Sequence, residues 1–375
     1  MVFEEHSAFD LFDLGWDDGW SAAFSGRAAG DGLVAARVVR VDKGACDIVS
    51  AEGEARAPLG GDLRRAAADD PVARPCVGDW VVVRRQPDGG LLIEAVLPRR
   101  TAIVRGGVAR ESRGGLSADS RGQVLAANID VVYVVEPAAH EPGEDSADLG
   151  RIERLLTLAW ESGARPVVLV TKADLAGDLP ALLDRVAEAA PGADVHAVSS
   201  LAGSGLESVR LGRGRTAVLL GPSGAGKSTL VNALADADLM ATQQVRASDG
   251  RGRHTTTHRE LLVLPGNGLV IDTPGLRRVG LYDADAGLSQ TFSDIEELAE
   301  DCRFSDCAHG AEPDCAVRAA VESGDLPRRR LDSWNKLRRE AAWMAGRTDA
   351  RLRAEQTRHW KIIHKEMRRS GRNRP

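Results

Sequence analysis

The order of three short segments constrains the fold of this chain more than any other feature. Residues 221–228 read GPSGAGKS, which fits the phosphate-binding pattern G-x-x-x-x-G-K-[ST]. Residues 272–275 read DTPG and follow it, as expected of a segment that contacts a metal ion and a terminal phosphate. The best guanine-reading segment, TKAD at 171–174, should follow both, yet it precedes the phosphate loop by about fifty residues. This order predicts a circularly permuted nucleotide domain.

The phosphate loop carries the residue types that a triphosphate requires. Gly221, Gly224 and Gly226 let the backbone fold closely around phosphates and direct N–H groups at them. A helix that begins near Lys227 adds its positive end. We expect Lys227 to reach the β- and γ-phosphates and the Ser228 hydroxyl to ligate Mg²⁺.

The TKAD segment favours GTP over ATP. A carboxylate can accept hydrogen bonds from guanine's N1–H and exocyclic amine, and adenine offers neither group there, so Asp174 predicts guanine specificity. Lys172 would lie along the base, and Thr171 opens the segment. Ser199 and Ser200 follow one β-α unit later. Read alone, the tetrapeptide could also be a surface Lys/Asp pair.

The residues around DTPG predict the metal and γ-phosphate contacts. Asp272 ends an apolar strand, so its carboxylate can face Mg²⁺, and the Gly275 N–H can bond the γ-phosphate. In GRGRHTTTHRE, Thr256 is our candidate for the second Mg²⁺ hydroxyl. Leu276 stands where a water-orienting Gln would follow, so we expect slow intrinsic hydrolysis that His254 or a partner completes. A polar loop histidine without a catalytic part is the other interpretation of His254.

These predictions give three residue sets. The predicted catalytic residues are His254, Lys227 and Thr256, and the Mg²⁺ ligands are Ser228, Thr256 and Asp272. The predicted GTP-binding residues are Thr171, Lys172, Asp174, Ser199, Ser200, Gly221, Ser223, Gly224, Ala225, Gly226, Lys227, Ser228, Thr229, Asp272 and Gly275.

A second cluster predicts a structural metal. Cys302, Cys307, His309 and Cys315 form the pattern C-x4-C-x-H-x5-C. Three thiolates and one imidazole make a closed tetrahedral zinc site with no open position for catalysis. The alternative is a group of reactive or buried free thiols.

Composition and charge limit the classes of protein to which this chain can belong. No apolar run of the 375 residues approaches eighteen, and the first residues lack a signal-peptide layout, so we expect a cytoplasmic protein with no membrane contact. Five cysteines suit a reducing compartment, and the isolated Cys46 and Cys76 fit small buried hydrophobes. Residues 328–375 hold 16 Lys and Arg against five Asp and Glu, although the chain carries −6 overall. A basic tail on an acidic body indicates a polyanionic partner such as RNA, or else a solvated charged helix.

The pattern along the chain predicts a multidomain α/β protein. Short β-rich runs with turn signals between them favour an OB-like barrel, with a generic barrel as the alternative. Apolar runs that alternate with helices then predict a parallel sheet with helices on both faces, followed by a zinc-binding and basic helical module. The predicted boundaries are a flexible arm with phenylalanine anchors at 1–30, the barrel at 31–100, an Arg/Gly-rich linker at 101–125, the permuted P-loop domain at 126–282 and the C-terminal module at 283–375.

Taken together, these motifs resemble the ribosome small-subunit-dependent GTPase family (RsgA, also called YjeQ) over about residues 33–365. The resemblance rests on the barrel, GPSGAGKST, GRHTTT, DTPG and the cysteine–histidine module with EPDCAV. It implies a GTP hydrolase that binds the maturing small ribosomal subunit, is stimulated by it, and leaves after hydrolysis. It also implies Mg²⁺ with GTP, one structural Zn²⁺, and rRNA contacts from the barrel and the C-terminal module.

One residue departs from the family pattern. The guanine segment usually starts with Asn, which braces the phosphate loop and reaches a purine ring nitrogen, whereas here it starts with Thr171. Thr171 can still offer a hydroxyl, so guanine affinity changes while Asp174 keeps the specificity. The family does carry a hydrophobic residue at the position of Leu276 and a histidine at that of His254.

Three other functions compete with an assembly GTPase that acts as a monomer. A GTP-sensing, rRNA-binding scaffold with negligible turnover is supported by the missing Gln. A P-loop ATPase conflicts with Asp174. A DNA-binding zinc protein conflicts with the metal spacing, since a major-groove finger needs its Cys and His pairs about twelve residues apart.

Overall fold

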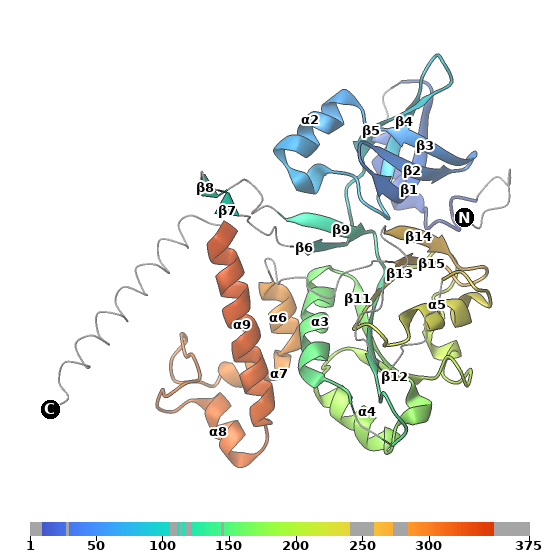
Figure 1. Ribbon diagram of the computed structural model, residues 1–375. Helices are drawn as coiled ribbons and strands as arrows, with labels where there is room; N and C mark the ends of the chain where they lie inside the picture. The colour runs from blue at the N-terminus through green and yellow to red at the C-terminus, as the bar shows by residue number, and fades with distance from the viewer. Residues whose placement is uncertain are drawn as a thin grey trace.

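The computed structural model describes residues 10–27, 30–105, 111–112, 115–116, 122–143, 146–240, 259–272 and 284–348. The elements form a barrel, an α/β domain below it and a group of helices beside the α/β domain (Figure 1). Each group draws on one part of the chain, in the order that the sequence predicts. The exact domain boundaries stay predictions.

The barrel has the topology of an OB-fold. Strand β1 (Leu33–Asp42) pairs antiparallel with β2 (Ala45–Ser50) and with β4 (Trp80–Arg85), while β2 also pairs with β3 (Gly53–Pro58) and β4 with β5 (Leu91–Val96). A parallel bridge between Leu59 and Ile93 closes β3 against β5, and helix α2 (Gly61–Asp69) with the short η1 (Pro71–Ala73) fills the chain between β3 and β4. The five-stranded Greek-key barrel is therefore present. Strand β3 and helix α2 were not expected, because GEARAP lacks an apolar run.

The segment expected to be an Arg/Gly-rich linker is partly β-structure. Strand β6 (Ala102–Arg105) pairs antiparallel with β9 (Gln123–Ala127), and β7 (Glu111–Ser112) pairs with β8 (Gly115–Leu116). Ile103 and Leu125 are buried, at 2% and 1% exposure. Burial of these short apolar runs stabilises the strands. The arginine- and glycine-rich residues around them show no strand pattern, so the sequence predicted a linker.

A six-stranded sheet forms the centre of the α/β domain. The spatial order is β12 (Asp194–Val198), β11 (Arg165–Thr171), β10 (Val131–Pro137), β13 (Thr216–Leu220), β15 (Leu269–Asp272) and β14 (Glu260–Val263). The first five are parallel, whereas β14 runs antiparallel because only a short turn joins it to β15. Strand β14 also pairs with β1 of the barrel at Arg40 and Glu260, so barrel and α/β domain share one continuous sheet.

Helices cover both faces of this sheet, as its alternating side chains require. Along β10, Val132 and Val134 join the apolar cluster under α3 (Leu149–Glu161) and α4 (Leu179–Glu188). Tyr133 and Val135 point the other way and pack with α5 (Lys227–Ala235) and the short η3 (Glu207–Val209). Strands buried on both faces account for the near-continuous apolar runs in the sequence.

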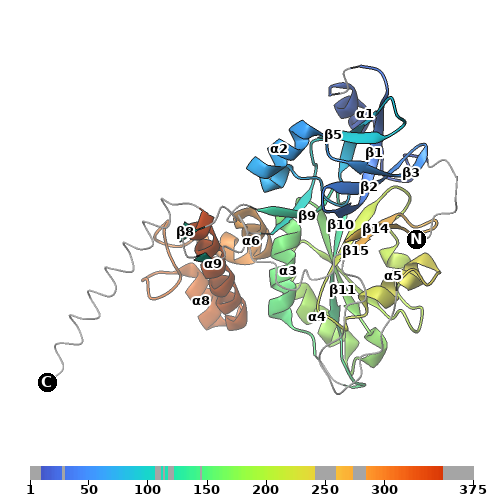
Figure 2. The ribbon, with the colours of Figure 1, turned by 45° about the horizontal axis from the view of Figure 1, so that its top comes forward.

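The C-terminal helices pack against the α3 side of the α/β domain (Figures 1 and 2). They are α6 (Asp285–Thr291), α7 (Ser293–Ala299), α8 (Ala316–Ser323) and α9 (Arg328–Thr348). Helix α6 lies so close to α3 that a Cβ on Gly287 would sit 2.2 Å from the Thr157 carbonyl oxygen. None of the described helices combines the length and the apolar content needed to cross a bilayer.

A buried ion network joins these helices to the α/β domain. Arg330, 1% exposed, contacts the Glu153 carboxylate of α3 at 2.9 Å and the Asp294 carboxylate of α7 at 2.5 Å. It also donates to the Thr291 carbonyl at 2.7 Å. Removing one partner of a buried pair costs about 3–5 kcal/mol, so this network fixes the C-terminal helices on α3.

The N-terminal arm packs against the barrel through helix α1 (Asp18–Ser25), whose N-cap Asp17 accepts from the Trp20 N–H at 2.9 Å. The arm is anchored by Leu14 and Trp20, at 1% and 3% exposure, while Phe12 is 52% exposed. The sequence had indicated phenylalanine anchors. Phe24 is partly buried, packs on the core and lies edge-on to Trp16, while Phe3 and Phe9 lie outside the described residues, so anchoring by phenylalanines stays a prediction.

Candidate functional site

The loop after β13 has the geometry of a phosphate cradle. A Cβ on Gly221 would sit 2.2 Å from the Val135 carbonyl oxygen, so only glycine fits where the loop leaves the sheet. Gly224 and Gly226 have φ values of 77° and 80°, the left-handed region that favours glycine. No side chain caps the N-terminus of α5, so its first N–H groups face the loop as anion donors.

Lys227 is folded back on this loop. Its ammonium donates to the carbonyls of Gly221 at 2.9 Å and Pro222 at 2.6 Å. These two hydrogen bonds tie the Lys227 ammonium to the start of the phosphate loop. Ser228 and Thr229 follow in the first turn of α5, both half-buried.

The guanine segment begins at the adjacent edge of the sheet. Thr171 is 3% exposed, and its hydroxyl donates to the Ala225 carbonyl at 2.7 Å. Thr171 therefore braces the phosphate loop through its hydroxyl, a contact that the sequence alone did not specify. Lys172 takes a left-handed conformation with φ of 53°, and Asp174 is exposed in the short η2 (Ala173–Leu175). An exposed carboxylate is open to a base from solvent.

The loop after β12 completes the same edge. Ser199 is 1% exposed, exchanges backbone hydrogen bonds with Ser204, and accepts from the Ala202 N–H at 3.2 Å. Ser200 follows it, half-buried. A short, closed turn thus stands beside Asp174 at the carboxyl ends of the parallel strands, where α/β sheets bind their ligands.

Asp272 reaches this edge from the other side. It ends β15, which runs parallel to β13 with Ile271 opposite Val218, so Asp272 lies beside the last residues of β13, which lead into the phosphate loop. The structure therefore brings together the predicted residues of all four strand ends. His254, Thr256, Gly275 and Leu276 lie outside the described residues.

The four predicted metal ligands converge in the C-terminal module. The ligand atoms of Cys302, Cys307, His309 and Cys315 all lie within 4.8 Å of one another. Cys302 Sγ lies 3.9 Å from Cys315 Sγ, and His309 Nδ1 lies 3.7 Å and 3.5 Å from those two sulfurs. Tetrahedral zinc, with bonds of about 2.3 Å to sulfur and 2.0–2.1 Å to nitrogen, requires edges of about 3.8 Å and 3.6 Å. These residues can hold a metal ion, and the spacing fits zinc.

The surroundings of the cluster favour the ligating forms of His309 and Cys302. Burial, then the Arg338 charge, lowers the pKa of His309, which keeps the imidazole neutral. Burial opposes the Cys302 thiolate, but the N–H groups of Val317 and Ala316 at the start of α8 bring the pKa of Cys302 below its ordinary value. For Cys307, the His309 backbone N–H favours the thiolate, but burial and the Cys315 and Cys302 thiols outweigh it and raise the pKa of Cys307 to about 11. The Trp334 ring packs on His309 at 5.2 Å between centroids. No sequence signal links Trp334 to the cluster, since it lies on a helix that follows the ligands.

Comparisons with known proteins agree with this geometry. A family model described as RsgA GTPase matches residues 96–282. A protein from Streptomyces avermitilis named small ribosomal subunit biogenesis GTPase RsgA is 50% identical over 359 residues, which cover 95% of this chain and 92% of that protein. The chain belongs to the RsgA GTPase family. A Streptomyces coelicolor RsgA of the same description is 51% identical over 98% of this chain and 93% of its own length.

Two solved structures share the RsgA fold of this chain. YjeQ from Thermotoga maritima has a TM-score of 0.57 at 23% identity, covering 81% of this chain and 97% of its own. YloQ, described as a circularly permuted GTPase, has a TM-score of 0.56 at 22% identity, covering 86% and 99%. The circular permutation predicted from the motif order is confirmed, and membership of the RsgA GTPase family makes the protein a GTP hydrolase.

The Thr171 bond leads to a testable expectation about guanine binding in this member of the family. A hydroxyl that donates to Ala225 cannot also donate to the purine nitrogen N7, so we expect GTP and 7-deaza-GTP, which lacks N7, to bind equally. Thr171→Asn should add that bond and favour GTP about threefold to tenfold, since a neutral hydrogen bond contributes about 0.5–1.5 kcal/mol. Equilibrium titration of both nucleotides measures the ratio. Thr171→Val is the matched control, because it removes the brace and should weaken both nucleotides alike. A wild-type preference for GTP over 7-deaza-GTP would contradict this account.

Proposed function

We propose that this protein binds the small ribosomal subunit during its late maturation and hydrolyses GTP to GDP and phosphate when the subunit stimulates it. The observation that carries the proposal is identity of 50% or more, along nearly the whole chain, to proteins named for small ribosomal subunit biogenesis. The resemblance extends through barrel, permuted domain and C-terminal module. We place the reaction in the cytoplasm, with the protein acting as a monomer.

The nucleotide roles follow from the edge of the sheet described above. Lys227 contacts the β- and γ-phosphates, Ser228 and Asp272 hold Mg²⁺, and Asp174 reads guanine. The N–H groups of the phosphate loop bind the phosphates, with Thr171 keeping that loop in place. Thr256 and Gly275 complete the Mg²⁺ and γ-phosphate contacts, and His254 is the proposed group that assists the attacking water.

The C-terminal module is the proposed rRNA contact, with one structural Zn²⁺ in the cysteine–histidine cluster. Helix α9 exposes Lys336, Arg339 and Trp343 at helical spacing on one face. Trp343 is 56% exposed. Cationic side chains beside an exposed aromatic ring suit a phosphate backbone and unstacked bases, which supports RNA as the partner.

One specific observation favours a second candidate function. Leu276 occupies the position of a water-orienting Gln, and a leucine side chain can neither accept nor donate a proton. A scaffold that senses GTP, binds rRNA and turns over negligibly would use the same phosphate loop and guanine segment.

GTP turnover with and without purified small subunits distinguishes the two functions. We expect strong stimulation by small subunits alone, with ATP and large subunits as inactive controls. Asp174→Asn should abolish the stimulated rate, because it disrupts the match to guanine, while Asp184→Asn on the exposed side of α4 should not. Flat turnover together with GTP-dependent binding to the subunit would favour the scaffold instead.

A further inference from the structure

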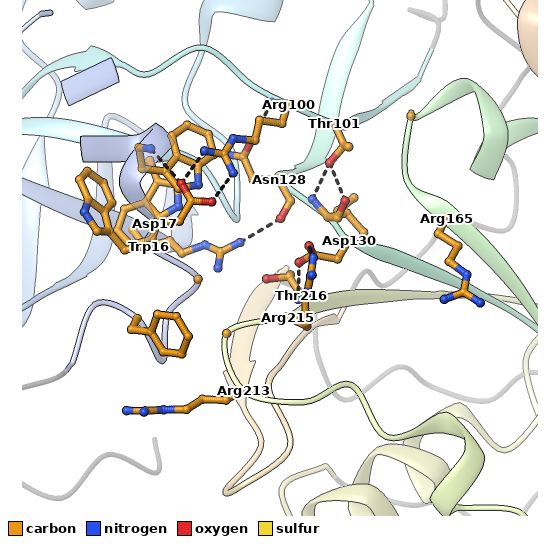
Figure 3. Close-up of a pocket in the computed structure, with 18 residues that line it drawn as sticks. Trp16, Asp17, Arg100, Thr101, Asn128, Asp130, Arg165, Arg213, Arg215 and Thr216 are labelled. Carbon is orange, nitrogen blue, oxygen red and sulfur yellow. Dashed lines mark hydrogen bonds and ion pairs between the residues drawn. The ribbon is translucent and has the colours of Figure 1, made fainter. Parts of the chain in front are cut away.

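A hollow of about 550 Å³ lies where the N-terminal arm, the barrel and the α/β domain meet (Figure 3). We call it the seam pocket. The arm contributes side chains such as Trp16, the barrel contributes Arg37 and Trp80, and the α/β domain contributes Arg165, Arg215 and Thr216. Its size is in the range of small-molecule sites, and its wall draws on three separate parts of the chain.

The seam pocket is separate from the nucleotide site. Thr216 begins β13 and Arg165 begins β11, so the pocket lies at the amino ends of the parallel strands. The phosphate loop lies at the carboxyl ends. A five-residue strand at about 3.3 Å per residue puts roughly 15 Å between the two edges, so both sites can be filled at once.

Arg37 gives this pocket a buried positive charge, which the charges of Asp130 and Asp79 stabilise from a distance without contacting it. It is 1% exposed, and it donates to the carbonyls of Asn128 at 3.0 Å, Gly78 at 3.3 Å and Leu14. No carboxylate among the described residues contacts it, and burial lowers the pKa of Arg37 to about 10. The other four arginines of the wall each have carboxylate partners, namely Arg100 with Asp17, Arg165 with Asp194, Arg213 with Asp10 and Asp13, and Arg215 with Asp130.

Several buried donors of the wall also have no acceptor among the described residues. Three of the five guanidinium N–H donors of Arg37 are used, which leaves two without an acceptor in the described structure. The Trp80 indole Nε1 and the Thr216 hydroxyl are both buried with no partner among the described residues. Asp130 accepts from the Thr216 backbone N–H at 2.8 Å and from Arg215 at 2.6 Å, but it is not hydrogen-bonded to the Thr216 hydroxyl (Figure 3). Buried donors normally have partners, so what the wall needs is a group rich in acceptors.

We propose that the seam pocket binds a phosphate-bearing anion of nucleotide size, held by Arg37, the Trp80 indole N–H and the Thr216 hydroxyl. A phosphoryl group offers only acceptors toward such donors and carries about −1.5 to −2 charges near neutral pH. It therefore supplies both the missing acceptors and the counter-charge for Arg37, and guanidinium forks match its oxygens. A free nucleotide and the phosphorylated end of an RNA strand share this chemistry. The site does not depend on the proposed subunit function.

A ligand here would touch the arm, the barrel and the α/β domain together. Its binding would tighten the contacts that Arg37 already makes to Leu14 of the arm and to Asn128 beside the α/β sheet. We therefore expect occupancy to slow hydrogen exchange in helix α1, which has few contacts beyond this seam.

Tryptophan fluorescence tests the proposal directly, because Trp16, Trp20 and Trp80 line the pocket and the chain has seven tryptophans in all. The full-length protein, with saturating Mg²⁺–GDP in the nucleotide site, is titrated with pyrophosphate, AMP and a 5′-phosphorylated hexaribonucleotide. We expect a saturable change with at least one probe. A response to pyrophosphate or AMP identifies a free phosphate compound, and a response to the oligonucleotide alone identifies a strand end.

Thr216→Val separates a ligand contact from a structural role. The hydroxyl has no partner in the described part of the chain, so its removal should leave the thermal midpoint unchanged or higher, while probe affinity falls about tenfold. Thr157→Val is the matched control, because that buried hydroxyl is bonded to the Glu153 carbonyl at 2.9 Å and lies on the remote side of α3. It should lower the midpoint and leave affinity intact. The proposal would be overturned if no probe gave a response, or if a response seen without GDP disappeared once GDP filled the nucleotide site. Equal probe affinity in Thr216→Val and the wild-type protein would also overturn it. In each case the seam pocket would hold only solvent.

Discussion

Replacing Lys227 by alanine should lower subunit-stimulated GTP turnover by about a hundred- to a thousandfold, the usual cost of removing one donor from a charge-stabilising site. Its ammonium lies within 2.9 Å of the Gly221 carbonyl and 2.6 Å of the Pro222 carbonyl, at the mouth of the phosphate loop. From there it can contact the β- and γ-phosphates, where charge develops during phosphoryl transfer. Single-turnover phosphate release, with small subunits in excess, measures the effect on chemistry apart from product release.

Two variants make this result interpretable. Lys43→Ala removes a lysine from an exposed barrel turn and should leave turnover unchanged. Lys227→Arg keeps the charge but presents a planar fork in a loop shaped around a compact ammonium, so it should remain strongly impaired. Binding of fluorescent GDP should weaken less than turnover, because GDP lacks the γ-phosphate. Wild-type turnover in Lys227→Ala would place the chemistry outside this loop.

Cys315→Ser should release one bound zinc ion and unfold the segment around the cluster. Cys315 is buried and lies within 4.8 Å of the other three ligand atoms, so no spare ligand takes its place. Structural zinc contributes apparent free energies of about 10–16 kcal/mol in zinc-finger peptides, far more than this small segment gains from its own core. Metal analysis should fall from one equivalent to none, and hydrogen exchange between residues 299 and 327 should lose its protection.

The matched control for zinc is Cys46→Ala. Cys46 is fully buried in the barrel, and burial raises the pKa of its thiol to about 12, so it is an inert apolar residue. Its loss should cost the barrel some stability and leave the zinc content at one. GDP affinity should survive in both variants, since the phosphate loop lies in another domain. Full zinc content in Cys315→Ser would mean that Cys315 is not a required ligand, and a wild-type protein without zinc would mean that the cluster is a group of free thiols.

Local chemistry explains which parts of this structure the sequence could predict. The phosphate loop, the guanine segment and the C-x4-C-x-H-x5-C pattern each lie within a few neighbouring residues, so their spacing carries the geometry. The runs VVLV and LVID predicted strands β11 and β15 because both faces of those strands are buried. The bond from the Thr171 hydroxyl to the Ala225 carbonyl is different, because it joins residues 54 positions apart and depends on the fold.

The parts that the sequence did not reveal depend on contacts between distant residues. Arg330 and Glu153 are 177 positions apart, and each alone is an ordinary charged residue on an amphipathic helix. Arg37 reads as one more arginine in an alternating strand, yet it bonds three carbonyls that belong to three different parts of the chain. Strand β3 has no apolar run and is held by its partner β2, so no local pattern could have identified it.

The single rung between Arg40 and Glu260 has a consequence for solubility. Strand β14 would otherwise be the last strand of its sheet, with backbone N–H and C=O groups ready to recruit another chain. Strand β1 occupies that side of β14, so the barrel covers an edge through which copies of the protein could otherwise aggregate. An isolated α/β domain that began after residue 97 would lose this cover, and its tendency to self-associate would reflect a bare edge rather than a misfolded core.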